Sequence, residues 1–245
     1  MKVELTNCYV LHSRPFKDSS ALLECFSAQY GLVTLIAKGA KRPRSRLQGI
    51  IQPFMLLQMS WFGKSELKTL SQVEATVIYP KLSGHKLLLG LYLNELLVRL
   101  LQHQDSHPNL FVDYDNTITA LAQTDNEQQL QMILRQFELK LVAELGYGID
   151  LFHDARTGLS ISPELLYCFD ATIGILEASS GSLAQQLTIS GASLIALQTG
   201  VCENETQLRE AKKLMRFVLT HYLGNKPLQS RKLFHHAQKG IPENV

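Results

Sequence analysis

The chain has 245 residues, 45% of them apolar and 19% charged, which excludes a disordered or low-complexity chain and allows one large or two modest domains. The net charge is only +2, but the charges are unevenly distributed. Lys and Arg outnumber Asp and Glu by ten to five in residues 1–80 and by eight to three in residues 204–245. In residues 81–203 the acidic residues are in excess, with fourteen Asp and Glu against six Lys and Arg. Two basic ends around an acidic middle are typical of a protein whose ends meet a polyanion, although chance clustering would give the same counts.

Residues 1–80 show the alternation and the β-branched and aromatic enrichment of short strands. The predicted strands are 3–12, 21–27, 32–37, 53–61 and 66–73. Ser13-Arg14-Pro15 is expected to end the first strand, and Gly31 to supply a positive φ at a turn. Five strands in this length predict a small closed barrel of the OB (oligonucleotide/oligosaccharide-binding) type, with an SH3-like barrel as the alternative.

After Pro80 the hydrophobic period changes from two to 3.6, which predicts a boundary between a barrel domain at 1–80 and a mainly helical domain at 81–245. The predicted helices are 83–102, 108–123, 125–145, 191–198 and 204–223. Thr124 and Glu127 have the spacing of a capping box at the start of the third. Residues 150–185 lose the helical period and predict an irregular insertion with a hairpin at 167–177. The fold class is therefore α+β and multidomain.

The densest charge cluster lies at residues 38–46, between the third and fourth predicted strands, where no residue is acidic. Its cations are Lys38, Lys41, Arg42, Arg44 and Arg46. Such a loop can follow a phosphate backbone and bind with strong salt dependence and little sequence preference, or it can be a solvated charged loop. The nearby aromatic residues Phe54, Trp61 and Phe62 could stack on bases, with Trp61 as the candidate, or pack in the core.

The last predicted helix carries a basic stripe beside an apolar one. The stripe consists of Arg209, Lys212, Lys213 and Arg216, and Lys226 and Arg231 extend the charge beyond the helix. This arrangement indicates a second DNA-binding surface. Contact with a membrane surface is the alternative, but the apolar face is modest and the other helices can receive it. No predicted segment is long and apolar enough to span a bilayer, and no secretory signal precedes the first strand, so we expect a cytoplasmic protein.

Motifs of catalysis are not found in the sequence: it has no glycine-rich phosphate loop, no Gly-x-Ser-x-Gly elbow and no His-Glu-x-x-His. We therefore expect no enzyme and no cofactor. All four cysteines, Cys8, Cys25, Cys168 and Cys202, are expected to be buried thiols. His153, Cys168 and Cys202 are scattered and form no Cys-x-x-Cys pair, so the sequence does not predict a metal site among them.

Five stretches that span nearly the whole chain resemble the RecO family of recombination mediators, and most closely its proteobacterial branch. They are Val10-Leu11-His12-Ser13-Arg14-Pro15, Ala37-Lys38-Gly39-Ala40, Gly90-Leu91-Tyr92-Leu93-Asn94-Glu95-Leu96-Leu97, Phe137-Glu138-Leu139 with Leu145-Gly146-Tyr147-Gly148, and Tyr222-Leu223-Gly224-x-Lys226-Pro227-Leu228-x-Ser230-Arg231.

The resemblance implies an N-terminal OB-fold, a helical domain and no catalytic residues. It also implies binding of single- and double-stranded DNA, annealing of complementary strands, and, with RecR, loading of RecA onto DNA coated with single-stranded-DNA-binding protein, all at the nucleoid. The loop at 38–46, to which we add Arg14, matches the family's DNA-binding barrel. For the segment 226–231 the resemblance leaves two contacts open, DNA or support of the preceding helix. Several family members carry a Cys-x-x-Cys zinc site in the second domain, and this sequence lacks that motif.

A mediator of this kind also has to recognise the acidic, Phe-terminated tail of single-stranded-DNA-binding protein. Such a peptide needs a cation beside an apolar pocket. Arg135, which matches a basic family position, offers that combination with Leu139 and Val142 on the same predicted helix. Two other functions remain open: a nucleic-acid-processing enzyme, which would show metal-dependent cleavage or ligation, and an RNA-binding module, which would prefer RNA to DNA of the same sequence.

Overall fold

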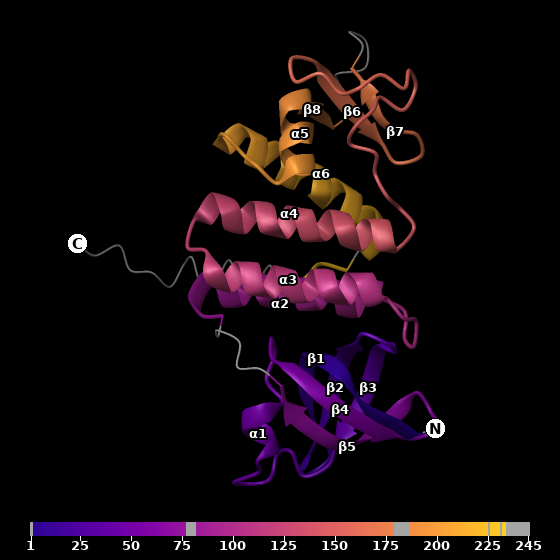
Figure 1. Ribbon diagram of the computed structural model, residues 1–245, viewed down its shortest axis with the longest axis vertical. Helices are drawn as coiled ribbons and strands as arrows, with labels where there is room; N and C mark the ends of the chain where they lie inside the picture. Colours follow the sequence, from indigo (N-terminus) through magenta and orange to yellow (C-terminus); the bar gives the residue numbers. More distant parts are fainter. Residues whose placement is uncertain (1, 77–81, 179–186, 225, 231, 234–245) are drawn as a thin grey trace, which may run out of the picture. The chain divides into compact units, whose positions relative to one another are not determined.

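The N-terminal part of the computed structural model is a closed barrel of five strands (Figure 1). The structure describes residues 2–76, 82–178, 187–224, 226–230 and 232–233. The strands are β1 (Lys2–Phe16), β2 (Ser20–Ser27), β3 (Gly31–Ala37), β4 (Leu56–Phe62) and β5 (Leu67–Ala75), and α1 (Leu47–Ile50) lies between β3 and β4. Their order is β1-β2-β3-β5-β4 with β4 returning to β1, and β3 and β5 are the one parallel pair. The predicted OB-type barrel is confirmed.

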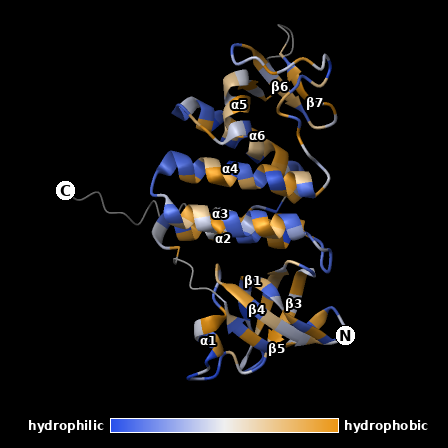
Figure 2. Ribbon diagram, in the orientation of Figure 1, coloured by the Kyte–Doolittle hydropathy of each residue, from blue (hydrophilic) through white to orange (hydrophobic). Residues whose placement is uncertain are grey.

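The interior of the barrel comes from alternate residues of each strand, because successive side chains in a strand point to opposite faces. Hydrophobic and hydrophilic residues accordingly alternate along the strands (Figure 2). Leu23 and Cys25 of β2, Leu35 of β3 and Met59 and Trp61 of β4 lie in this core and are at most 1% exposed. Burial of each large apolar side chain stabilises the barrel by roughly 1.5–3 kcal/mol.

The turns of the barrel differ from the prediction at one point. The first strand does not end at Ser13-Arg14-Pro15: Pro15 pairs with Ala21, and β1 continues to Phe16. A proline is tolerated there because it lies at the end of the hairpin, where few ladder hydrogen bonds remain to be made. The prediction for Gly31 is confirmed, since its φ is 61° and a Cβ atom would lie 1.7 Å from the carbonyl oxygen of Asp105.

Two helices, α2 (Gly84–Leu100) and α3 (Pro108–Gln123), pack beside the barrel as part of the same compact unit. The side chain of Asn94 donates to the carbonyl of Leu11 in β1 (2.9 Å) and accepts from the hydroxyl of Tyr114 in α3 (2.6 Å). The rings of Tyr9 and Phe26, on the outside of the barrel, pack against Phe111 of α3. One buried polar network and one aromatic cluster thus fix α2 and α3 to β1 and β2.

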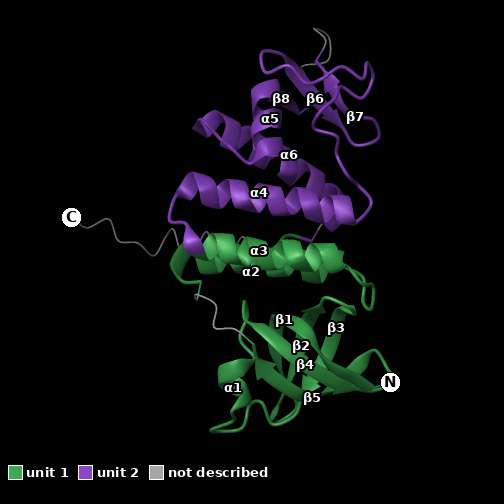
Figure 3. Ribbon diagram, in the orientation of Figure 1, with its two compact units in different colours: residues 1–122, 227–245 green, residues 123–226 purple. Residues whose placement is uncertain are grey.

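The chain divides into two compact units (Figure 3): residues 1–122 with 227–245, and residues 123–226. The first two helices therefore cluster with the barrel, although the change of sequence period lies near residue 80. The domain boundary at residue 80 stays a prediction. None of the helices in the described ranges has both the length and the hydrophobicity that a membrane-spanning helix needs.

The described residues of the second unit form three helices and a three-stranded sheet. Its elements are α4 (Glu127–Glu144), β6 (Leu166–Asp170), β7 (Gly174–Glu177), β8 (Thr188–Ser190), α5 (Gly191–Thr199) and α6 (Glu205–Leu223), with the sheet order β7-β6-β8. The predicted hairpin is confirmed, with Tyr167 opposite Glu177. The predicted capping box is wrong: Asn126 is the N-cap of α4, and its side chain accepts from the amide of Gln129.

Candidate nucleic-acid interface

The basic loop at 38–46 is a fixed chain of turns on the barrel. Ala40 is 1% exposed and packs in the barrel core, and the amide of Lys41 donates to the carbonyl of Ser19 in the β1–β2 turn (2.9 Å). Arg44 has a φ of 62°, within a run of tight turns. All five predicted cations are exposed: Lys38, Lys41, Arg42, Arg44 and Arg46. The anchored backbone presents them to solvent as one group.

The β1–β2 turn adds charge beside this loop. Arg14 is exposed on β1, and Lys17 is exposed in the turn that accepts the hydrogen bond from Lys41. Asp18, also exposed, is the acid of this turn. Lys17 was not among the predicted residues, and its position two residues after Pro15, in a hairpin turn, is the signal that could have found it.

The pairing register of the strands places six residues in one row across the outside of the barrel. The row is Arg14, Leu22, Ile36, Thr69, Phe62 and Lys2, each paired directly with the next. Directly paired residues share a face of the sheet, so a cation lies at each end of the row, and the apolar side chains of Leu22, Ile36 and Phe62, with the hydroxyl of Thr69, lie between. Phe62 is 48% exposed in this row. Its exposed ring can offer a face to a base.

The prediction that Trp61 stacks on DNA is wrong. Trp61 is 1% exposed, points into the barrel core and packs edge-on against Tyr30, with ring centroids 5.3 Å apart. Phe54 is also buried, at 7% exposure. Because Trp61 and Phe62 are neighbours in one strand, only one of them can point outward, and the register assigns that place to Phe62.

The basic stripe of α6 is exposed as predicted. Arg209, Lys212, Lys213 and Arg216 all face solvent, whereas Leu208, Ala211, Leu214, Met215, Val218 and Leu219 are buried. The carboxylate of Glu210 joins α6 to the start of α5, because it accepts hydrogen bonds from the amide and hydroxyl of Ser190 and from the hydroxyl of Ser193. Burial would raise the pKa of Glu210, but these hydrogen bonds and the nearby Arg209 lower it overall.

Residues 228–230 pack on α2. Leu228 and Ser230 are buried, and Glu95 accepts hydrogen bonds from the amides of Gln229 and Ser230. Of the two contacts left open for this segment, residues 228–230 make a structural one. Lys226 is exposed, and Arg231 lies outside the described residues.

The predicted site for a peptide tail on α4 is wrong. Arg135 is 8% exposed, and its guanidinium lies 2.7 Å from the carboxylate of Glu138, which is fully buried in the same helix. Val142 is 1% exposed and Leu139 is half-buried. The charge of Arg135 is therefore already neutralised inside the protein, and neither it nor Val142 offers a surface to a ligand.

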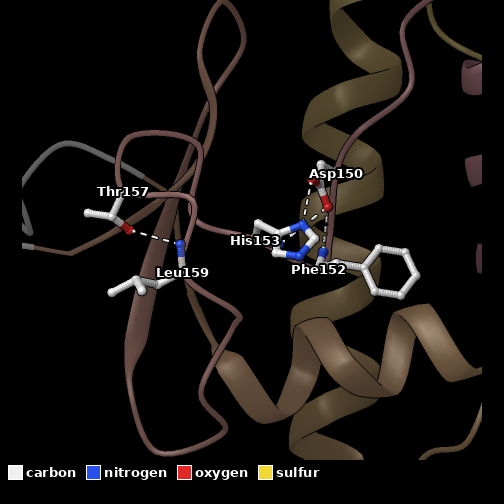
Figure 4. Close-up of polar contacts among 5 residues, drawn as sticks. All are labelled: Asp150, Phe152, His153, Thr157 and Leu159. Atoms are coloured by element: carbon white, nitrogen blue, oxygen red, sulfur yellow. Dashed lines mark hydrogen bonds and ion pairs between the residues drawn. The ribbon is translucent and has the colours of Figure 1, made fainter.

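His153, Cys168 and Cys202 do not form a metal-binding cluster in the described part of the chain, and each has another partner. The ring of His153 lies 3.0 Å from the carboxylate of Asp150, as Figure 4 shows. The thiol of Cys168 is directed to the carbonyl of Leu176 and that of Cys202 to the carbonyl of Asn204. Cys8, Cys25 and Cys168 are buried as expected, but Cys202 is only half-buried, because it lies in the loop between α5 and α6. Within the described ranges, no group of three or more His, Cys, Asp or Glu side chains could hold a metal ion.

The loop around His153 is organised by a buried carboxylate. Asp154 accepts hydrogen bonds from the amides of Arg156 and Thr157, from the hydroxyl of Thr157 and from the amide of Glu177 at the end of β7. The turn that follows is closed by the hydroxyl of Thr157, which accepts from the amide of Leu159 (Figure 4). Burial would raise the pKa of Asp154, but the hydrogen bonds lower it overall. The carboxylate of Asp154 therefore stabilises this loop and joins it to the end of β7.

Known protein families match both the barrel and the region that follows it. A closed OB-type barrel with an anchored basic loop, joined to a helical region, defines a class of OB-fold proteins with a basic surface. Two family models match the chain, "Recombination protein O N terminal" over residues 1–79 and "Recombination protein O C terminal" over residues 82–232. The chain therefore belongs to the RecO family, which supports a role in recombination repair.

Curated relatives cover almost the whole chain. Proteins named "DNA repair protein RecO" are 41% identical over 230 residues in Photobacterium profundum (94% of this chain and 95% of that protein) and 42% identical over 238 residues in Vibrio vulnificus (97% and 95%). A protein of the same name in Aliivibrio salmonicida is 40% identical over 234 residues (96% of each). These relatives are proteobacterial, as the resemblance of the motifs indicated.

Proposed function

We propose that this chain is a recombination mediator that binds DNA and catalyses no covalent step. The observation that carries the proposal is the loop at 38–46: five cations, all exposed, on a backbone that is pinned by Ala40 and Lys41. An anchored backbone lowers the ordering cost of binding, because only the exposed side chains of the cations remain to be ordered by the phosphates. The row from Arg14 to Lys2 continues the surface from this loop towards Phe62.

The binding that this surface supports is mainly electrostatic. Each phosphate that a Lys or Arg neutralises releases counterions, so affinity falls steeply as salt rises and depends little on sequence. Single strands gain a further contribution from stacking on Phe62, worth roughly 1–3 kcal/mol per base. Both single- and double-stranded DNA are therefore ligands. Arg209, Lys212, Lys213, Arg216 and Lys226 provide a second basic surface on and after α6.

As a mediator, the protein anneals complementary strands and, with RecR, helps to load RecA onto DNA coated with single-stranded-DNA-binding protein. Support for these partners comes from membership of the RecO family and from the motif resemblance. Contact with the acidic tail of single-stranded-DNA-binding protein belongs to the same proposal, at a place other than Arg135.

Strand annealing tests the proposal. The purified chain is mixed with two complementary DNA strands coated in their cognate binding protein, at several salt concentrations and without ATP or added metal. We expect rapid annealing that weakens with salt. The triple variant Lys41→Gln, Arg42→Gln, Arg44→Gln should anneal slowly, whereas Arg156→Gln, an exposed cation in the second unit, should anneal at the normal rate.

Three results would contradict the proposal. Tight binding to naked DNA without annealing would leave a DNA-binding protein that is not a mediator. Metal-dependent cleavage or ligation, or a clear preference for RNA over DNA of the same sequence, would favour the enzyme or the RNA-binding module instead.

A further inference from the structure

An exposed aromatic ring lies beside the basic stripe of α6. Phe217 is 49% exposed, although the neighbouring apolar residues of the helix are buried. Lys213 lies one turn before it, and Arg216 precedes it directly. Since residues four apart share a helix face, the ring of Phe217 and the ammonium group of Lys213 are neighbours on the surface.

The ring of Phe217 is held on one side and open on the other. It packs edge-on against Phe169 of β6, with centroids 6.0 Å apart and an interplanar angle of 84°. Phe169 itself is half-buried in the small sheet, which Figure 1 shows beside α6. A single exposed apolar residue is ordinary on a protein surface; here, however, the ring is oriented by a partner and flanked by cations.

Two carboxylates near this surface are engaged within the protein, and the exposed Glu205, one turn before Arg209, is outnumbered by the four exposed cations of the stripe. Glu210 binds Ser190 and Ser193, and Asp170, next to Phe169, accepts from the amide and hydroxyl of Thr172. The surface is therefore suited to a polyanion. Arg209 and Arg216 are seven residues apart, about 10 Å along the axis at 1.5 Å per residue, which gives room for a short run of phosphates.

We propose that Phe217 is a stacking platform for the bases of single-stranded DNA, whose phosphates lie along Arg209, Lys213 and Arg216. The proposal rests on the proposed DNA-binding function and adds to it the choice of ligand at α6. In a duplex the bases are stacked on one another and hidden from a ring on a helix surface. Unpaired strands expose their faces, so Phe217 favours single strands, whereas the cations alone do not, because each phosphate contact releases more counterion from a duplex.

The test uses the full chain with Lys41, Arg42 and Arg44 changed to Gln, so that binding at the barrel loop is weakened. In this background Phe217→Leu keeps an apolar side chain but removes the aromatic face, and Phe217→Tyr keeps both the ring and its contact with Phe169. Three ligands are compared at low salt: oligo-dT, an abasic strand of the same length, and a duplex. We expect Phe217→Leu to weaken binding of oligo-dT by roughly five-fold or more and Phe217→Tyr to preserve it. Binding of the abasic strand and the duplex should change little.

A separate pair of substitutions distinguishes failure of this inference from failure of the proposed function. Lys213→Gln with Arg216→Gln, in the same background, should weaken all three ligands. If it does and Phe217→Leu changes none of them, or all equally, the stacking proposal is wrong and the basic surface stands. If neither change affects binding, α6 does not bind DNA at all. Loss of binding to an acidic peptide that ends in Phe, with oligo-dT unchanged, would overturn the proposal in favour of a peptide site.

Discussion

Glu95 and Ser230 are 135 residues apart in the chain, yet the carboxylate of Glu95 accepts hydrogen bonds from both the amide (2.8 Å) and the hydroxyl (2.6 Å) of Ser230. Its other oxygen accepts from the amide of Gln229 at 2.7 Å. One carboxylate in the middle of α2 thereby ties the C-terminal segment to the unit that contains the barrel.

Glu95→Ala should release this segment. Hydrogen bonds to a charged group contribute roughly 1.5–3 kcal/mol each, although their losses do not add. We expect the free energy of unfolding to fall by about 2 kcal/mol and the amides of Gln229 and Ser230 to exchange with deuterium much faster. Urea unfolding and hydrogen exchange measure the two effects. As a control, Glu66→Ala, at an exposed position in the β4–β5 loop, should change neither quantity. Unchanged hydrogen exchange in Glu95→Ala would show that Glu95 does not hold residues 229 and 230 in place.

Salt dependence should report directly on the basic loop. If Lys41, Arg42 and Arg44 each neutralise a phosphate, changing them to Gln one after another should weaken binding to DNA of any sequence. Each change should also lower the slope of log affinity against log salt by about 0.7 for single strands and about 0.9 for duplexes. Titrations at several salt concentrations measure the slope, with Arg156→Gln as the control of equal charge. An unchanged slope would remove the loop from the interface.

The helices and strands of this fold could be predicted from hydrophobic periodicity, but the burial of two candidate site residues, Trp61 and Arg135, could not. Alternation in β4 showed that a strand was present, while the choice of Trp61 or Phe62 as the outward residue depends on register with β5 and β1, which a single strand does not reveal. Helix periodicity placed Arg135 next to an apolar stripe. It could not show that Glu138, three residues later, would form an ion pair with it in a buried setting.

The cations at 38–46 and on α6 could be predicted because a long charged side chain in a loop or on the polar face of a helix needs no tertiary partner to be exposed. By contrast, the roles of Glu95 and Glu210 depend on backbone donors that are brought to them from distant segments, and Asp154 adds the distant amide of Glu177 to its local donors. No spacing in the sequence marks such carboxylates. Their hydrogen bonds are visible only once the chain is folded.

Substitutions at Trp61 and Phe62 should separate stability from binding. Trp61→Ala leaves a cavity in the barrel core and should lower the free energy of unfolding by about 3–5 kcal/mol. Phe62→Ala, at an exposed position, should change it by less than about 1 kcal/mol while weakening binding to oligo-dT several-fold. Urea unfolding and fluorescence anisotropy measure the two effects. Unaltered DNA binding in Phe62→Ala would exclude the row from Arg14 to Lys2 from the DNA interface. An unchanged stability of Trp61→Ala would contradict the strand register that places Trp61 in the barrel core.

Asp154 should make stability depend on pH in acid. Its pKa in the folded chain lies below the ordinary value of about 3.9, so the unfolded chain binds the proton more readily. The contribution of the carboxylate is therefore complete above the unfolded pKa and is lost as pH falls through the folded one. Asp154→Asn should lower the free energy of unfolding at pH 7, and the difference from the unaltered chain should shrink as the pH approaches 3. Urea unfolding across this range, with Asp18→Asn as an exposed control, measures it. A difference that does not vary with pH would mean that the side chain acts through its shape and hydrogen bonds rather than through its charge.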